Sequence, residues 1–259
     1  MKSAPMLGYR RFTWAVVLPS HQEAPAMLEV CGINSFYGGA HILHNVSLKV
    51  SAGEVVALLG RNGAGKTTTM KSINGLVRPR SGSITFAGFE TTNLPSYRIC
   101  RLGLGYVPEE RRIFSDLTVL ENLEVGRRTA KGDGHAWRVD TLFELFPNLA
   151  ERRHNSGAQL SGGEQQMLTI ARTLMGNPKM ILLDEPSEGI APVIVEKMAE
   201  TILELKNTGL TVVISEQNLY FAKLLSDRAY VIESGEIRYE GSITDLEADP
   251  ELREKYLAV

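Results

Sequence analysis

The segment Gly60-Arg-Asn-Gly-Ala-Gly-Lys66-Thr67 constrains the fold of this chain more than any other. It follows residues 54–60, a short, almost wholly apolar run that is typical of a strand buried on both faces. It opens a helical pattern over residues 66–74, which ends at Gly75, a favourable helix-terminating residue. A glycine-rich turn between a buried strand and a helix is the setting of the phosphate-binding pattern G-x-x-x-x-G-K-[ST]. Composition alone produces this pattern in about one chain per hundred, and its position argues against chance.

The chemistry of this pattern depends on backbone N–H groups that wrap a phosphate where a Cβ would clash. Lys66 is expected to neutralise the β- and γ-phosphates of a nucleotide, and the Thr67 hydroxyl to ligate Mg²⁺. The candidate nucleotide-binding residues of this segment are Gly60, Arg61, Asn62, Gly63, Ala64, Gly65, Lys66, Thr67 and Thr68.

A second element is the apolar run at residues 180–184, which ends in Asp184 and is followed by Glu185. A strand that ends in a carboxylate places Asp184 near the Mg²⁺, and Glu185 beyond the strand end is able to polarise an attacking water. Taken alone, the segment is explained equally well by two solvated acids at a strand end. The phosphate-binding segment upstream favours the catalytic interpretation.

Apolar runs alternate with helical patterns from residue 28 onward, which predicts an α/β fold. Residues 211–215 form another buried strand, and the alternation at Val46, Leu48 and Val50 predicts an antiparallel strand with one wet face. An amphipathic helix is expected over residues 192–206, with apolar positions at Val193, Val195, Met198, Ile202 and Leu205.

The middle of the chain differs, because residues 117–160 show helical patterns and no strand candidates. Lys131-Gly-Asp-Gly134 is a flexible break within it. We therefore expect a helical subdomain, over about residues 110–165, inserted into the sheet domain. Its apolar faces are formed by Leu120, Leu123, Val125, Leu142, Phe143, Leu145 and Phe146.

The heptapeptide Leu160-Ser161-Gly162-Gly163-Glu164-Gln165-Gln166 carries a family resemblance. Locally, Ser161 is a helix cap, and the first-turn N–H groups of the helix offer an anion site. The heptapeptide is similar to the signature motif of the ABC ATPase family, and the resemblance extends over residues 27–242. It implies a phosphate-loop ATPase of the ABC type, with a mixed central sheet, an antiparallel β subdomain and an inserted helical subdomain. It also implies ATP and Mg²⁺ as cofactors, and a head-to-tail dimer in which the signature residues Ser161, Gly162, Gly163 and Glu164 contact the γ-phosphate held by the opposing cassette.

The same resemblance assigns an adenine-stacking aromatic. Tyr37, in Ser35-Phe-Tyr-Gly38, matches the family position, and Phe36 is the alternative. A ring suits this position because adenine presents a π-face. A structural aromatic in a β-region is the competing interpretation.

Three positions depart from the usual ABC pattern. Glu109 replaces a glutamine that contacts Mg²⁺ and the attacking water, and a carboxylate can still ligate the metal. Gln217 replaces a switch histidine, so it can hydrogen-bond a γ-phosphate but takes up no proton near neutral pH. Ala191 replaces an aspartate. The implied catalytic residues are Glu185, Lys66 and Gln217, and the implied metal ligands are Thr67, Asp184 and Glu109.

These departures occur within Pro-Glu-Glu-Arg-Arg-Ile-Phe, Glu-Pro-Ser-Glu-Gly-Ile-Ala-Pro and Glu-Gln-Asn, which together resemble the LivF-type cassette of branched-chain amino acid importers. That resemblance implies a second, different cassette chain, two transmembrane permease subunits and, indirectly, a periplasmic binding protein. It places the chain peripherally at the cytoplasmic face of the inner membrane. Alternatives are a cassette for urea or short amides, an exporter cassette, a soluble ABC ATPase of DNA repair, translation or iron–sulfur assembly, and a non-catalytic nucleotide-binding regulator.

Composition narrows these alternatives. The formal net charge of −2 provides no basic excess for a nucleic-acid partner, and Cys31 and Cys100 form no disulfide framework. No apolar run approaches the roughly 20 residues of a membrane-spanning helix. Residues 1–26 hold three basic residues before a short apolar stretch, but Pro19 stops that stretch without a clear cleavage site. We expect a disordered extension here rather than a secretory signal, and a nucleotide-binding domain over residues 27–259.

Overall fold

The computed structural model describes residues 26–129, 136–251 and 254. The predicted N-terminal extension lies outside the described residues except for Ala26, with which the first strand begins. The predicted break at Lys131–Gly134 also lies outside them.

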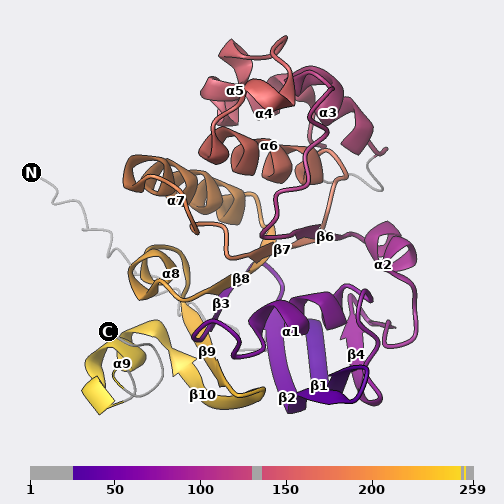
Figure 1. Ribbon diagram of the computed structural model, residues 1–259, viewed down its shortest axis with the longest axis vertical. Helices are drawn as coiled ribbons and strands as arrows, with labels where there is room; N and C mark the ends of the chain where they lie inside the picture. The colour runs from indigo at the N-terminus through magenta and orange to yellow at the C-terminus, as the bar shows by residue number, and fades with distance from the viewer. Residues whose placement is uncertain (1–25, 130–135, 252–253, 255–259) are drawn as a thin grey trace, which may run out of the picture.

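The central sheet has six strands in the order β10-β9-β3-β8-β7-β6 (Figure 1). β3, β6, β7, β8 and β9 are parallel, and β10 pairs antiparallel with β9. Every residue of β3, β7 and β8 is buried, as expected of apolar strands covered on both faces. The predicted mixed sheet is therefore confirmed. Its strands are β3 (Val55–Leu59), β6 (Leu104–Val107), β7 (Met180–Asp184), β8 (Thr211–Glu216), β9 (Arg228–Glu233) and β10 (Glu236–Ser242).

A second, antiparallel sheet has the strand order β2-β1-β4-β5. On β2 the side chains of Val46, Leu48 and Val50 are buried, while those of Ser47 and Lys49 are exposed, so the predicted strand with one wet face is confirmed. The strands of this sheet are β1 (Ala26–Tyr37), β2 (Ala40–Ser51), β4 (Ser81–Phe86) and β5 (Phe89–Glu90).

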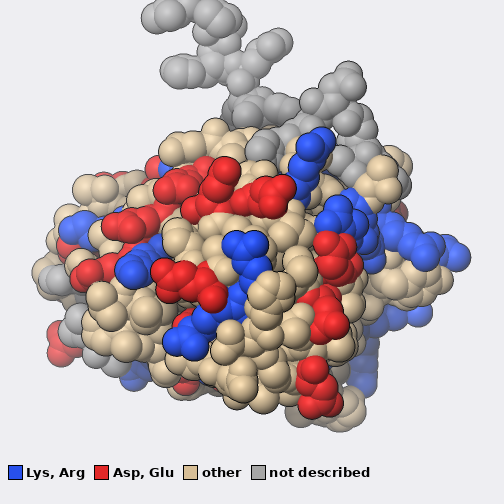
Figure 2. All heavy atoms as spheres, turned by 90° about the horizontal axis from the view of Figure 1, so that it is seen from above, with Lys and Arg blue, Asp and Glu red and all other residues tan. Residues whose placement is uncertain are grey.

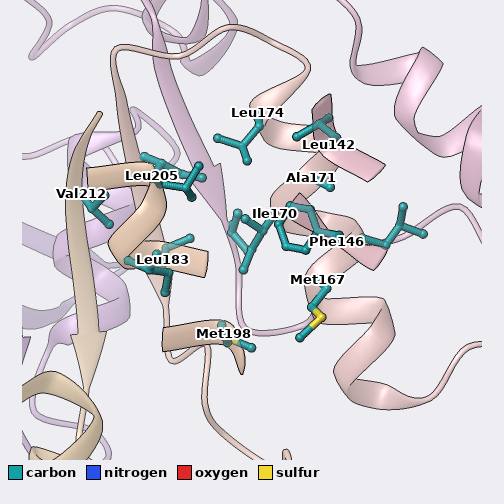
Figure 3. Close-up of a cluster of buried hydrophobic side chains, with 14 of the residues drawn as sticks. Leu142, Phe146, Met167, Ile170, Ala171, Leu174, Leu183, Met198, Leu205 and Val212 are labelled. Carbon is teal, nitrogen blue, oxygen red and sulfur yellow. The ribbon is translucent and has the colours of Figure 1, made fainter. Parts of the chain in front are cut away.

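The two faces of the central sheet have different covers. One face packs against the antiparallel sheet and α1 (Lys66–Ile73), through Met70 and Ile73. The other packs against α6 (Gly162–Leu174) and α7 (Pro192–Asn207). Figure 3 shows part of this second core, a buried cluster that includes Ile170 and Leu174 of α6 and Leu183 of the sheet. The remaining helices are α2 (Ser96–Leu102), α3 (Val119–Gly126), α4 (Val139–Leu145), α5 (Pro147–Glu151), α8 (Leu219–Leu225) and α9 (Ile243–Ala248), with a 3₁₀ turn, η1 (Gly157–Gln159).

Between β6 and β7 the described residues form helices α3 to α6 and no named strand. Two predictions about helix faces are wrong. Val125, expected on an apolar face, is 57% exposed, because it lies in the last turn of α3 beside an open surface depression that also includes Phe114 and Arg172. Val193 is 59% exposed, because the core-facing side of α7 becomes buried only from Met198 onward.

Charge on the helical end of the molecule is mixed. Figure 2, seen from above, shows acidic and basic side chains interspersed over this face. It is not the single-sign basic surface that a sequence-independent nucleic-acid binder requires. Within the described ranges, none of the helices has the length and apolar character to span a bilayer.

Candidate functional site

The phosphate-binding segment lies between β3 and α1, as predicted. Gly65 has a φ of 116° and immediately precedes α1, whose start has no side-chain cap and no acidic residue in its first turn. A Cβ at Gly65 would lie 2.9 Å from Leu43 Cδ2, and one at Gly60 would collide with the carbonyl oxygen of Ile232. The glycines therefore allow a close backbone turn that leaves the N–H groups of α1 available to an anion.

Lys66 is the buried cation of this site, with 3% of its surface exposed. Its Nζ donates to the carbonyl oxygens of Gly60 (2.7 Å) and Arg61 (3.1 Å). It also lies 3.0 Å from Oε1 of Glu185. A buried charge is tolerated when it is paired in this way.

Asp184, at the end of β7, is fully buried and accepts three hydroxyl hydrogen bonds. Thr67 Oγ1 donates to its Oδ1 at 3.1 Å, Ser215 Oγ to the same oxygen at 2.6 Å, and Tyr106 OH to Oδ2 at 2.9 Å. Burial, and then the charge of Asp184, raise the pKa of Tyr106. Thr67 and Asp184 were expected to meet, but Ser215 and Tyr106 were not predicted.

Glu185 follows Asp184 with a φ of 45° and 7% of its surface exposed. Its N–H donates to the Ser215 carbonyl at 3.0 Å, which fixes the turn. Its Oε2 is buried and accepts no hydrogen bond from an N–H, ammonium or alcohol group of the described residues. A hydrogen bond to Glu185, followed by burial and the charges of Glu185 and Glu109, raises the pKa of Glu188 to about 7. The Glu185 carboxylate is thus held by Lys66 on one side and faces another acid on the other.

Glu109 and Gln217 differ in how the structure places them. Glu109 follows β6, and partial burial, then the charges of Glu185 and Asp184, raise its pKa. β6 pairs in parallel with β7, with Val107 opposite Leu183, so Glu109 and Glu185 follow neighbouring strands at the same edge of the sheet. Gln217 follows β8 and is exposed, and none of the contacts found among the described residues joins it to the other candidate residues.

A cavity of 240 Å³ lies beside the phosphate-binding segment. Tyr37, 48% exposed at the end of β1, forms part of its wall. Phe36, the alternative aromatic, does not line this cavity and stacks on His41 at a centroid distance of 4.0 Å. Of the two candidates, Tyr37 is the one that faces the site. The lining residues are Tyr37, Ile42, Gly63, Gly65, Lys66, Thr67, Thr68 and Glu185.

The signature residues occupy the start of α6. Ser161 accepts from the Glu164 N–H at 3.3 Å, and Glu164 Oε2 accepts from the Ser161 N–H at 2.8 Å, which forms a capping box. A Cβ at Gly163 would lie 2.7 Å from Ile194 Cγ2. Because α1 and α6 cover opposite faces of the central sheet, one chain does not bring these residues to its own phosphate-binding segment.

Comparison with known proteins agrees with this geometry. Residues 43–188 match the family model described as ABC transporter. The chain is 45% identical, over 89% of its length and 99% of the relative, to the high-affinity branched-chain amino acid transport ATP-binding protein BraG of Pseudomonas aeruginosa. It is 39% identical, over 85% of its length and 92% of the relative, to the lipopolysaccharide export system ATP-binding protein LptB of Haemophilus influenzae.

A solved structure of a nucleotide-free ATP-binding cassette from an ABC transporter matches with a TM-score of 0.76 and 28% identity, covering 88% of this chain and 98% of that one. The predicted fold and the predicted resemblance to branched-chain amino acid cassettes are thereby confirmed.

Proposed function

The chain belongs to the ATP-binding subunits of the ABC transporter family, and we propose that it energises the uptake of branched-chain amino acids through separate permease subunits. It is an ATPase, since the ATP-binding subunits of such transporters hydrolyse ATP. The cargo assignment rests on the similarity to the P. aeruginosa protein, which extends over nearly the whole of that relative. The combination of Glu109, Ala191 and Gln217 supports the same assignment.

The triphosphate of ATP binds at the start of α1. Residues Gly60 to Thr68 surround it, and Lys66 contacts its β- and γ-phosphates. Two observations support this placement. The N-terminus of α1 has no side-chain cap, and a Cβ at Gly60 or Gly65 would crowd neighbouring atoms. Tyr37 stacks on the adenine, since it lines the cavity that continues from this segment.

Mg²⁺ is held by Thr67, Asp184 and Glu109. The fit rests on the 3.1 Å hydrogen bond that puts the Thr67 hydroxyl beside an Asp184 oxygen, and on the parallel pairing of β6 with β7, which places Glu109 and Asp184 at the same edge of the sheet. Hydroxyl and carboxylate oxygens are the ligands that Mg²⁺ prefers. When bound, the ion neutralises charge that develops between the β- and γ-phosphates.

Glu185 is the group that takes the proton of the attacking water. The water oxygen bonds to the γ-phosphorus as the bond to the bridging oxygen breaks, and ADP leaves with that oxygen. The Glu185 Oε2 is buried and accepts no hydrogen bond from an N–H, ammonium or alcohol group of the described residues, so it is available to accept this proton when the Glu188 carboxyl is ionised. Binding of a triphosphate gives Lys66 a second anionic partner and loosens its 3.0 Å pairing with Glu185. Gln217 contributes a hydrogen bond to the γ-phosphate.

The site is completed by a second cassette. Ser161 to Glu164 contact the γ-phosphate in the opposing subunit, and two ATP molecules lie at the interface. The separation of α1 and α6 on opposite faces of the sheet supports this arrangement. The partner is a different chain, because Glu109, Ala191 and Gln217 depart from the usual residues near the interface. The assembly includes two permease subunits, is supplied by a periplasmic binding protein, and holds this chain at the cytoplasmic face of the inner membrane.

Transport in proteoliposomes tests the cargo. The chain is assembled with two permease subunits and a second cassette chain from its own organism, and ATP-dependent uptake of radiolabelled leucine is measured in the presence of a binding protein. We expect uptake that depends on ATP and is lost with Glu185→Gln. Stimulation of hydrolysis by lipopolysaccharide, without leucine uptake, would contradict the proposal and favour the export function named for the H. influenzae relative.

A further inference from the structure

The turn between β1 and β2 carries Tyr37. The two strands pair up to Tyr37 and Ala40, so that Gly38 and Gly39 alone connect them. Gly38 has a φ of 58°, which is the left-handed region that a tight hairpin turn needs. Both glycines are exposed, and a Cβ on either would meet nothing within 4 Å. The turn therefore gains little order from packing around its own residues.

Arg80, just before β4, supplies a contact from outside the hairpin. Its Nη2 donates to the carbonyl oxygen of Gly38 at 2.5 Å. Its Cζ lies 4.0 Å from the centroid of the Phe36 ring. Its own backbone N–H donates to the Asn34 carbonyl at 2.8 Å, which fixes the arginine relative to β1. One side chain thus contacts both neighbours of Tyr37 in the sequence.

The Phe36 ring links this contact to β2. His41 stacks on it at 4.0 Å with an interplanar angle of 8°, and the His41 ring lies 3.8 Å from that of His44. Arg80 and His41 each lie 4.0 Å from the Phe36 ring centroid, so the ring contacts both of them. Arg80, Phe36, His41 and His44 thus contact one another in this order along the hairpin, with the two histidine rings tilted by 46°, and we term this row of side chains the hairpin stack.

The far end of the hairpin stack is tied to the phosphate-binding segment. The His44 N–H donates to the Gly235 carbonyl at 2.8 Å, and the Gly235 N–H donates to the Ala64 carbonyl at 2.8 Å. Two hydrogen bonds therefore fix the base of the hairpin relative to the phosphate-binding segment. At the exposed tip, where Tyr37 lies, Arg80 provides the corresponding restraint.

We infer that Arg80 is a positioning residue for the adenine base: by holding the turn through Gly38 and Phe36, it keeps Tyr37 in the orientation that stacks on adenine. This inference rests on the proposed adenine contact of Tyr37. Arginine suits the role because its planar fork stacks on a ring and donates hydrogen bonds at the same time. Arg80 contacts neither the phosphates nor the reacting atoms, so it affects binding of the base and leaves the rate of hydrolysis at saturation unchanged.

A double-mutant cycle on the full chain tests this inference. Dissociation constants for Mg-ATP and for Mg-tripolyphosphate, which lacks the base, are measured by calorimetry for wild type, Tyr37→Ala, Arg80→Ala and the double variant. We expect Tyr37→Ala to weaken ATP binding roughly tenfold, the effect of losing one base stack. Arg80→Ala should weaken it about threefold. The double variant should match Tyr37→Ala alone, because Arg80 acts through the ring. Tripolyphosphate binding should be the same in all four proteins.

Two further variants complete the test. Arg78→Ala removes another exposed arginine from the same loop and should leave ATP binding unchanged. Arg80→Lys keeps a donor but loses the planar face, so its affinity should lie between those of wild type and Arg80→Ala. Saturating hydrolysis rates of the assembled transporter should agree for Arg80→Ala and wild type.

The outcomes separate this inference from the proposed function. If Tyr37→Ala weakens ATP binding while Arg80→Ala does not, or if the two effects add, the role of Arg80 is refuted and the adenine contact stands. If Arg80→Ala weakens tripolyphosphate binding equally, Arg80 supports the fold in general and the inference is also refuted. If Tyr37→Ala leaves ATP binding unchanged, the adenine contact itself is wrong, and the inference fails with it.

Discussion

Helices α1 and α6 both begin at glycine-rich segments, yet they treat their first backbone donors in opposite ways. At α1 the preceding residue is Gly65, no side chain caps the helix, and the first turn holds no acid. At α6 Ser161 and Glu164 form a reciprocal capping box that satisfies the N–H groups of these two residues within the chain. An uncapped helix N-terminus with a nearby cation attracts an anion strongly. A capped N-terminus is already stable without an anion, so its contact with one is weaker.

The comparison indicates that the two helix starts have different roles in the proposed ATPase site. Beside the start of α1, the same chain supplies Lys66, the buried carboxylate of Glu185, and Asp184, which accepts hydrogen bonds from three hydroxyl groups. The start of α6 is structurally complete in the absence of a nucleotide and lies on the other face of the sheet. Variants at the α1 end should therefore change nucleotide binding and chemistry in this chain, whereas variants at the α6 end should change ATP hydrolysis only in an assembled transporter.

The largest effect is expected from Glu185→Gln. The amide fills the same space but does not accept a proton, so hydrolysis should fall by about 10²- to 10⁴-fold, while ATP affinity is retained. Steady-state phosphate release by the assembled transporter and nucleotide affinity of the isolated chain provide the measurements. Glu196→Gln on the exposed side of α7 is the matched control and should hydrolyse at the wild-type rate. Near-wild-type hydrolysis by the Glu185 variant would remove this residue from the mechanism.

Lys66→Ala should weaken ATP binding by roughly 10- to 100-fold, since a charge-assisted contact to phosphate is lost. The substitution also leaves the buried Glu185 carboxylate without its cation, which should lower the free energy of unfolding of the nucleotide-free chain by about 3 kcal/mol. Urea denaturation measures this second effect. The double variant Lys66→Ala with Glu185→Gln should recover part of the stability and none of the affinity. If it recovers no stability, the 3.0 Å pairing does not stabilise the fold.

Ser161→Ala should lower the free energy of unfolding by about 1 kcal/mol, because a helix cap is lost. Thr118 forms the same capping box with Glu121 at the start of α3, and Thr118→Ala should cost a similar amount. The two variants should separate in the assembled transporter, where Ser161→Ala reduces hydrolysis by about tenfold and Thr118→Ala does not. Equal hydrolysis rates for the two would mean that the start of α6 is only structural.

The smallest effect concerns pH. The hydrogen bond to Glu185, then burial, raise the pKa of Glu188 from its ordinary 4.5 to about 7. A raised carboxyl pKa stabilises the folded chain fully below about 4.5, and this contribution is lost as the pH rises through about 7. The melting temperature of the nucleotide-free wild type should therefore fall more between pH 5 and 7.5 than that of Glu188→Gln. The difference between the two falls should be no more than about 2 °C, because Glu188 is largely exposed. Parallel profiles for the two proteins would refute the coupling.

Much of the α1 end could be predicted from the sequence, because the pattern is local. The buried strand, the glycines, Lys66 and Thr67 are contiguous, and Asp184 and Glu185 end a strand of their own. The partners of Asp184 were missed for a physical reason. Tyr106 and Ser215 reach Asp184 only because β6 and β8 flank β7, and strand order in a parallel sheet does not follow from sequence order.

The sequence also failed to predict which side chains are exposed at the ends of helices. The periodicity of α3 and α7 is correct, but it does not reveal where along each helix the neighbouring layer begins. Val125 and Val193 are exposed for that reason. The pairing of Lys66 with Glu185 was likewise not predicted, since Lys66 was assigned to the phosphates of the nucleotide and Glu185 to the attacking water.

The placement of the two helix starts on opposite faces of the sheet has a consequence for genetics. In the proposed dimer, an allele with a lesion at Ser161 leaves this gene product able to bind its own nucleotide, and the defect appears at the site of the partner gene's product. An allele with a lesion at Lys66 does the reverse. The two alleles, expressed together in one cell, fail to complement in a heterodimer, because each assembly receives only one copy of this chain. In a homodimer the same pair would rebuild one intact site, so that growth on limiting amino acids distinguishes the two assemblies without purifying either.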